Sequence, residues 1–378
     1  MKTEQRKWTQ STGWDRPLEG SANNDFQLVF IFGGTSALKD KKHVEEIRRA
    51  YPKAYLFGCS TAGEIVGTQV LDDTLIVTAV HFDHARVEGA SAKSKGPEDS
   101  LRVGQELGKR LKPEGLAHVL VLSDGLAVNG TDLVKGLMQH LPKNVALTGG
   151  LSGDGSRFQE TLVLAGGEPE KNTVGVVGLY GDKLKVGYGS LSGWDTFGPE
   201  RRITRSKANV LYELDGQSAL ELYKKYLGEH AAGLPATGLL FPLSLKVNEG
   251  GESIVRTILA VDEKEQSMTF AGDMPEGSMA RLMKANFDRL VDGAAGAAKN
   301  SLSINRSSPD MAILISCVGR KLILKQRIEE EVEAVRGILG PKTALTGFYS
   351  YGEISPFTPG AKCELHNQTM TITTFSES

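Results

Sequence analysis

Residues 57–65, FGCSTAGEI, place a thiol, two hydroxyls and a carboxylate on one short glycine-containing segment. Cys59 or Ser60 could act as a nucleophile, but only with a base beside it. A serine nucleophile elbow has the pattern G-x-S-x-G, and the run from Gly58 to Gly63 is one residue too long for it. A hydrolase or transferase that uses Cys59 or Ser60 is therefore an alternative hypothesis, behind that of a ligand cradle.

The same pattern returns near the other end of the chain, in GFYSYGEI at 347–354. The shared positions are Gly58 with Gly347, Thr61 with Ser350, and Gly63, Glu64 and Ile65 with Gly352, Glu353 and Ile354. A third segment, LTGGLSGDG at 147–155, keeps Gly149 and Ser152 but has Asp154 and Gly155 in place of Gly-Glu. Because the cysteine does not recur, the repeat favours binding over catalysis.

The repeated pattern suits a small zwitterion such as an amino acid. Glycine lets the backbone approach a ligand closely, and successive N–H groups in such a turn attract an anion. The hydroxyl can donate or accept, and the carboxylate suits an ammonium group. The alternative is a purely structural turn whose glutamate caps a nearby N–H. The predicted ligand-binding residues are Gly58, Cys59, Ser60, Thr61, Gly63, Glu64, Gly149, Ser152, Asp154, Gly347, Tyr349, Ser350, Gly352 and Glu353, and no catalytic or metal-binding residue is predicted.

A buried-type strand and a helix precede each of the three segments, as in FQLVFIFGG and LKDKKHVEEIRRAYP before the first. The predicted fold class is α/β, with two packed halves, each a mixed parallel and antiparallel sheet covered by helices. Strand–helix–strand–glycine-turn units repeat within it. The three turns should lie at the carboxyl ends of strands, where open α/β sheets bind ligands.

Other elements are expected between these units. Residues 73–82 and 85–94 predict an antiparallel pair, because only a short connection separates them. Residues 278–298 predict a helix with Ser278 as its N-cap, and 364–375 predict one closing strand. Residues 1–25 are polar and are expected to form a flexible lead-in, docked in part through Trp8 or Trp14.

Composition limits the class of partner. The chain has 378 residues and a net charge of −2, from 44 Lys+Arg and 46 Asp+Glu. It therefore has no basic field for nucleic acid. Its apolar runs are too short to cross a membrane, and no signal peptide is expected at its start. Cys59, Cys317 and Cys363 have no metal-ligand spacing, which favours reduced thiols in a cytoplasmic protein.

Several segments together resemble the FIST sensory domain family. YPKAYLFGCSTAGEI, LVLSDGL and LTGGLSGDG are similar to its N-terminal part. The run LYELDGQSALELYKKYLG and the terminal GFYSYGEISP are similar to the remainder. The resemblance implies a FIST N-terminal domain at 26–205 and a FIST C-terminal domain at 206–378.

The resemblance also implies a function, that of a bacterial signal-input protein that binds a small ligand without catalysis. Since the sequence shows no kinase, cyclase, receptor or F-box segment, the expected partner acts in trans, a histidine kinase or another signalling protein. Some family members are described as haem-binding nitric oxide sensors, so a haem gas sensor is an alternative. No histidine here has a C-x-x-C-H context, and no cofactor is predicted.

Overall fold

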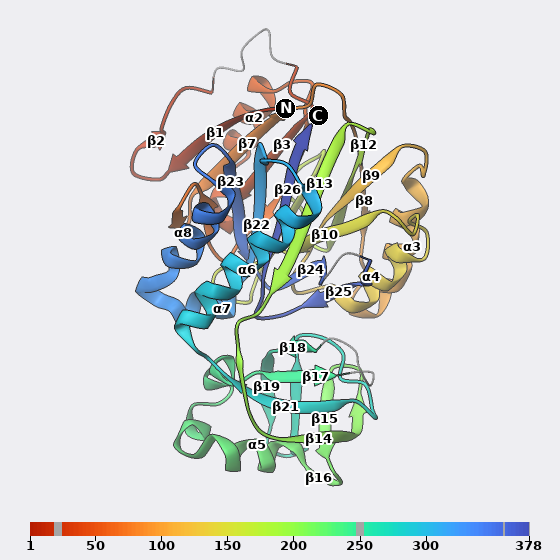
Figure 1. The fold of residues 1–378 in the computed structure, drawn as a ribbon, viewed down its shortest axis with the longest axis vertical. Coiled ribbons are helices and arrows are strands. Elements are labelled where there is room, and N and C mark those ends of the chain that lie inside the picture. Colours follow the sequence, from red (N-terminus) through yellow and green to blue (C-terminus); the bar gives the residue numbers. More distant parts are fainter. Residues whose placement is uncertain (19–24, 247–252, 358–359, 378) are drawn as a thin grey trace.

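The computed structural model describes residues 1–18, 25–246, 253–357 and 360–377. Figure 1 shows two bodies joined by two chain connections. The lower body runs from β14 (Asp195–Lys207) to β21 (Met279–Lys284). The upper body holds the rest of the chain, including both termini. The chain enters the lower body after β13 (Leu184–Leu191) and returns into α6 (Phe287–Asn305).

The upper body is built from three six-stranded sheets. Sheet 1 has the order β11 (Val163–Ala165), β4 (Tyr55–Ser60), β3 (Leu28–Gly33), β7 (Leu75–His81), β1 (Lys2–Thr9) and β2 (Gly13–Trp14). Sheet 2 has the order β25 (Cys363–His366), β24 (Gly352–Pro356), β10 (Ala146–Leu151), β9 (Leu116–Ser123), β12 (Thr173–Tyr180) and β8 (Arg86–Lys93). Sheet 3 has the order β13, β26 (Met370–Glu377), β22 (Met311–Cys317), β23 (Ala344–Ser350), β5 (Glu64–Val66) and β6 (Gln69–Leu71).

The three sheets share one plan. Each contains a parallel pair whose strands are joined through one or more helices: β3 with β4, β9 with β10, and β22 with β23. An antiparallel strand, β7, β12 or β26, lies on the far side of the first member of each pair. The predicted α/β class, with mixed sheets and repeated strand–helix–strand units, is confirmed.

Each unit also donates a strand to another unit. The strand that follows β4 is β5, and it pairs with β23. The strand that follows β10 is β11, and it pairs with β4. The strand that follows β23 is β24, and it pairs with β10. This cyclic exchange ties sequence-distant units together.

The predicted domain boundary between residues 205 and 206 falls inside β14, and the division into 26–205 and 206–378 stays a prediction.

Helices cover the outer faces of the sheets (Figure 1). In the upper body they are α1 (Thr35–Lys39), α2 (Lys41–Ala50), α3 (Ser100–Arg110), α4 (Gly130–Met138), α6, α7 (Val318–Leu324) and α8 (Ile328–Leu339), with short 3-10 segments at Pro97–Asp99 and Lys325–Arg327. The inner faces share one core, since side chains of β3, β9 and β22 belong to the same buried cluster. The rings of Phe32 and Phe348 meet there at 4.8 Å between centroids.

The lower body is a single antiparallel sheet with its own core. Between β14 and β21 its elements are β15 (Val210–Leu214), β16 (Gln217–Ser218), α5 (Ala219–Leu227), 3-10 segments at Gly228–Gly233 and Ala236–Leu240, β17 (Leu243–Lys246), β18 (Ile254–Arg256), β19 (Ile258–Asp262) and β20 (Ser267–Phe270). A smaller apolar cluster that includes Trp194 and Leu290 packs where the two connections meet the upper body.

The first glycine of each repeat lies inside a strand, so its interpretation as a turn residue was wrong. Gly58, Gly149 and Gly347 sit in β4, β10 and β23. Their register partners in the neighbouring parallel strands are Ile31, Val121 and Leu314. A Cβ added at any of the three would overlap the carbonyl oxygen of that partner. The repeated glycine is therefore required by close strand contact.

Two other expectations about strands were wrong. The residues predicted as an antiparallel pair are β7 and β8, which lie in different sheets, because the short connection passes from one sheet to the next. Residues 364–375 do not form one strand. The chain leaves sheet 2 after His366 and enters sheet 3 at Met370.

The helix expected from Ser278 was also wrong over its first part. Met279–Lys284 is strand β21, and α6 begins after Asn286, whose side chain accepts a hydrogen bond from the Arg289 N–H.

The expected flexible lead-in is instead a strand over Lys2–Thr9, because β1 pairs with the buried strand β7. Both tryptophans dock as expected. The Trp8 ring lies 4.2 Å from that of His43, and Trp14 Nε1 donates to Glu46. Residues 19–24 lie outside the described part of the chain.

Candidate functional site

The three repeated segments meet in a closed ring of backbone hydrogen bonds. The Ala62 N–H donates to the Tyr349 carbonyl at 2.8 Å, and the Tyr351 N–H donates to that of Leu151 at 3.1 Å. The ring closes where the Gly153 N–H donates to the Ser60 carbonyl at 3.0 Å. The structure thus brings the predicted segments together, but by packing them directly against one another.

Glu64 and Glu353 are both fully buried and are held in the same way. Glu64 accepts hydrogen bonds from the Thr61 hydroxyl and from the N–H and hydroxyl of Thr74. Glu353 accepts them from the Ser350 hydroxyl, at 2.6 Å, and from the N–H and hydroxyl of Thr369. These bonds match the alternative of a structural turn.

Burial dominates the electrostatics of both carboxyls. It raises the pKa of Glu64 to about 7 and that of Glu353 to about 8, against the opposing effect of the hydrogen bonds. Both groups are therefore protonated over part of the neutral range. A neutral carboxyl is a weaker partner for a ligand ammonium group than an ionised one.

Asp154 is held by its own loop. It accepts backbone N–H groups from Phe158, Gln159 and Glu160 at 2.8 to 2.9 Å, and the Tyr351 hydroxyl also donates to it. Although burial opposes the change, these bonds together lower its pKa. The side chain fixes the loop after β10.

The remaining predicted residues are buried strand or turn residues. The Ser60 hydroxyl accepts the Leu162 N–H at 2.8 Å, and the Ser152 hydroxyl donates to the Ser123 carbonyl at 3.0 Å. Tyr349 donates to Glu331 at 2.7 Å. Cys59 is fully buried, and burial raises its thiol pKa well above the usual range. These surroundings suit packing better than nucleophilic attack.

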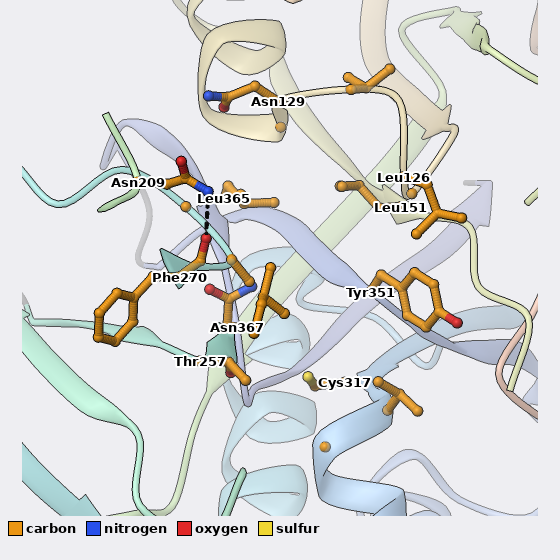
Figure 2. Close-up of a pocket in the computed structure, with 18 of the residues that line it drawn as sticks. Leu126, Asn129, Leu151, Asn209, Thr257, Phe270, Cys317, Tyr351, Leu365 and Asn367 are labelled. Atoms are coloured by element: carbon orange, nitrogen blue, oxygen red, sulfur yellow. Dashed lines mark hydrogen bonds between the residues drawn. The ribbon is translucent and has the colours of Figure 1, made fainter. Parts of the chain in front are cut away.

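A cavity of about 320 Å³ lies between the upper and lower bodies, and we call it the interbody cavity. Its upper wall comes from the loop after β9, the end of β22 with the start of α7, the segment around Tyr351, and the turn between β25 and β26. Its lower wall includes Thr257, Phe270 and Ala271. Figure 2 shows Asn367 between these walls, near Thr257 and Phe270.

Two polar groups of this cavity are unpaired. Asn367 is 1% exposed, and neither its amide nitrogen nor its amide oxygen has a hydrogen-bond partner among the described residues. The hydroxyl of Thr257, which is 5% exposed, is also without one in the same ranges. Buried polar groups are nearly always paired, and an unpaired one is costly. These two groups are therefore free to bond a polar guest in the cavity.

The predicted site residues lie outside the interbody cavity. Thr61, Gly63 and Glu64 line a smaller cavity of about 270 Å³, together with Arg157 and Lys321. Whether the fourteen predicted residues contact a ligand stays a prediction.

Two family models match the chain. The model of the FIST N domain matches residues 27–217, and that of the FIST C domain matches residues 219–356. The chain belongs to the FIST family. FIST domains are known as sensory domains for small ligands in signalling proteins, which fits a sensor role for this FIST protein.

Individual relatives add little to this assignment. An uncharacterized protein of Methanocaldococcus jannaschii is 23% identical over 333 residues, which are 81% of this chain and 62% of that protein. The chain thus spans less than two thirds of the curated relative it matches. A crystal structure titled cyanuic acid hydrolase, from A. caulinodans, shares 10% identity and covers 78% of this chain and 99% of that chain. Its TM-score of 0.18 is too low for any inference.

The sequence interpretation missed the polar residues of the interbody cavity in this FIST protein. Asn367 lies in a stretch that alternates like a strand, and nothing in the pattern sets it apart. Thr257 follows a short strand of the lower body. The available signal was Asn367 itself, since asparagine favours turns.

Proposed function

We propose that this FIST protein is a non-catalytic sensor whose small ligand binds in the interbody cavity. The observation that carries the proposal is the buried carboxamide of Asn367, which has a donor and an acceptor without partners among the described residues. The cavity is largely apolar with few polar groups, as small-molecule sites generally are.

The position of the cavity explains how a ligand would produce a signal. Its walls belong to two bodies that are connected through β13–β14 and β21–α6. A ligand that contacts both walls stabilises one arrangement of the bodies over others, by as much as its affinities for those arrangements differ. A partner in trans would read this arrangement, and the family resemblance suggests a histidine kinase. Free thiols at all three cysteines suit a cytoplasmic protein.

The haem alternative receives no support from the residues present. No histidine is among the described residues that line the interbody cavity. Two buried histidines are already engaged: His118 Nε2 lies 2.8 Å from the Thr148 hydroxyl, and His366 Nε2 lies 2.7 Å from the Ser355 carbonyl. Burial lowers the pKa of His118 to about 3 and that of His366 to about 4, so both rings are neutral and held within the fold.

The smaller cavity supports a second candidate position, for the predicted amino acid. Arg157 and Lys321 stand in its wall with Asp72 and Asp73, so charges of both signs are available to a zwitterion. Lys321 is already bonded to the Ala62 carbonyl at 2.9 Å and to Asp72. Because Lys321 is already engaged in these bonds, we place the smaller cavity second as a ligand site.

A thermal-shift screen with neutral metabolites, amino acids and haem tests the proposal. A ligand at 100 times its Kd should stabilise the protein by about 2.7 kcal/mol. Ala271→Leu should strongly reduce the shift, because the larger side chain takes up part of the interbody cavity beside the ligand. Ala260→Leu is the matched control, an exposed position on β19 outside the lining. An Ala271→Leu protein that responds to the ligand like wild type would rule out this cavity.

A further inference from the structure

We infer that the ligand of the interbody cavity is an uncharged molecule with a flat apolar body and one edge that carries a hydrogen-bond donor beside an acceptor. A primary amide or a lactam has such an edge. This inference rests on the proposed function and adds the chemical class of the ligand.

The absence of charge in the cavity wall argues for an uncharged ligand. None of the described residues that line the cavity is Asp, Glu, Lys, Arg or His. Placing an ionised group in an apolar site without a countercharge is very costly. A free amino acid or a carboxylate would therefore bind poorly.

The repeat supplies an internal comparison for this point. Asp72 precedes Thr74 by two residues, as Asn367 precedes Thr369, and the two threonines hold Glu64 and Glu353 alike. Asp72 lines the smaller cavity, where Lys321 neutralises it. At the equivalent place the interbody cavity has an uncharged amide instead.

The donor–acceptor edge follows from the chemistry of Asn367. A carboxamide has an N–H₂ donor and a carbonyl acceptor side by side, so it forms two parallel hydrogen bonds with an edge of complementary order. Thr257 adds a hydroxyl that can donate or accept. A ligand with only acceptors, or only donors, would leave one atom of the Asn367 amide unpaired, which is a strong penalty.

The flat apolar body follows from the rest of the wall. The rings of Phe158 and Tyr351 are stacked at 4.4 Å between centroids and 15° between planes. Both line the cavity with Phe270, Leu126 and other apolar side chains. Aromatic rings gain from offset stacking and from edge-to-face contacts. A planar ring therefore suits this space better than a flexible polar chain.

Three probes of nearly the same shape test the inference: benzamide, benzoate and benzamidinium. Benzamide is neutral with both a donor and an acceptor, benzoate is an anion without a donor, and benzamidinium is a cation without an acceptor. Isothermal titration at 1 to 20 mM probe should show benzamide binding at least about tenfold tighter than either ion, since each ion leaves one buried atom of the Asn367 amide unpaired. Failure of all three to bind, or tighter binding of an ion, would overturn the inference.

Two variants of Asn367 complete the test. Asn367→Leu should weaken benzamide about tenfold without lowering the melting temperature of the free protein, because it removes an unpaired buried amide. Asn367→Asp should reverse the preference, so that benzamidinium binds best. Unchanged preferences in both variants would contradict the role of Asn367. A charged metabolite that binds in the first screen and is blocked by Ala271→Leu would leave the sensor function intact while overturning the inferred ligand class.

Discussion

Glu64 and Glu353 occupy equivalent positions at the two ends of the chain, and each carboxyl ties a turn to the start of a strand in another sheet. Glu64 binds Thr74, directly before β7 of sheet 1, although Glu64 itself belongs to sheet 3. Glu353 in sheet 2 likewise binds Thr369, directly before β26 of sheet 3. The glutamate of the repeated Gly-Glu therefore connects one sheet to the next.

These two glutamates should make the protein less stable as the pH rises. Burial raises the pKa of Glu64 to about 7 and that of Glu353 to about 8, so the folded state binds more protons than the unfolded state above pH 4.5. Their stabilisation is complete below the unfolded pKa and is lost as the pH rises through 7 and 8. Each group contributes a slope of at most about 1.4 kcal/mol per pH unit. Urea unfolding at pH 5 to 8 measures it.

The double variant Glu64→Gln, Glu353→Gln isolates this effect. It should flatten the slope between pH 5 and 8, since neither amide titrates. Glu263→Gln is the control: Glu263 is an exposed partner of Lys224, and its removal should leave the slope unchanged. A double variant that keeps the full wild-type slope would contradict the assignment.

The repeat could be predicted from the sequence because its causes are local. Each unit consists of a strand, a helix and a small residue at a fixed place, all within one contiguous stretch of sequence, and the three stretches fold as such units. The exchange of β5, β11 and β24 between units could not be predicted, since the partner of an edge strand is set by tertiary packing. The sequence interpretation consequently placed β7 and β8 in one pair, whereas they lie in two sheets.

The strand glycines should tolerate no side chain. A Cβ at Gly58, Gly149 or Gly347 would overlap a backbone carbonyl of the adjacent parallel strand. Backbone cannot move aside as a side-chain tip can, so we expect each Gly→Ala variant to lose about 3 kcal/mol or more, in the range of the larger core substitutions. Chemical denaturation measures the loss.

Gly337→Ala is the matched control for the glycine variants. Gly337 lies in α8, and an added Cβ there meets no atom within 4 Å. Alanine at such a helical position should stabilise the protein by up to about 1 kcal/mol. Equal losses in the strand and helix variants would show that close strand contact is not the cause.

The candidate cavity shows where prediction from sequence fails. Asn367 is a candidate ligand-binding residue because it lines a cavity with Thr257, more than a hundred residues earlier in the chain, and because the lower body covers the upper one there. Neither relationship leaves a periodicity or a motif. Thr61 and Glu64, in contrast, are conspicuous in the sequence, but their polar atoms form hydrogen bonds within the fold.

Removing one partner of the buried ion pair between Arg320 and Glu331 should strongly destabilise the protein. Both side chains are fully buried at 2.7 Å, and Tyr349 and Ser316 donate to the same carboxylate. Arg320→Met leaves that charge uncompensated, so we expect a loss of about 3 to 5 kcal/mol in urea unfolding.

Two further variants distinguish the effect of losing the ion pair from the effect of leaving Glu331 as an uncompensated buried charge. Arg320→Met with Glu331→Leu should recover part of the stability, because no buried charge remains. Arg48→Met removes a half-exposed arginine that pairs with Glu168 at 3.5 Å and should change little. A single Arg320→Met variant no less stable than Arg48→Met would refute the prediction.

Cys59 should be chemically silent in the folded protein. It is fully buried in β4, and burial raises its thiol pKa, so the reactive thiolate is suppressed. Cys317 also has a raised pKa but lines the interbody cavity, and it should react first of the two. Iodoacetamide labelling followed by peptide mass spectrometry should therefore find Cys59 unmodified in native protein and labelled in urea. Cys59→Ala should also keep the ligand-induced thermal shift. Rapid native labelling of Cys59 would reopen its role as a nucleophile, because a substrate could then reach it.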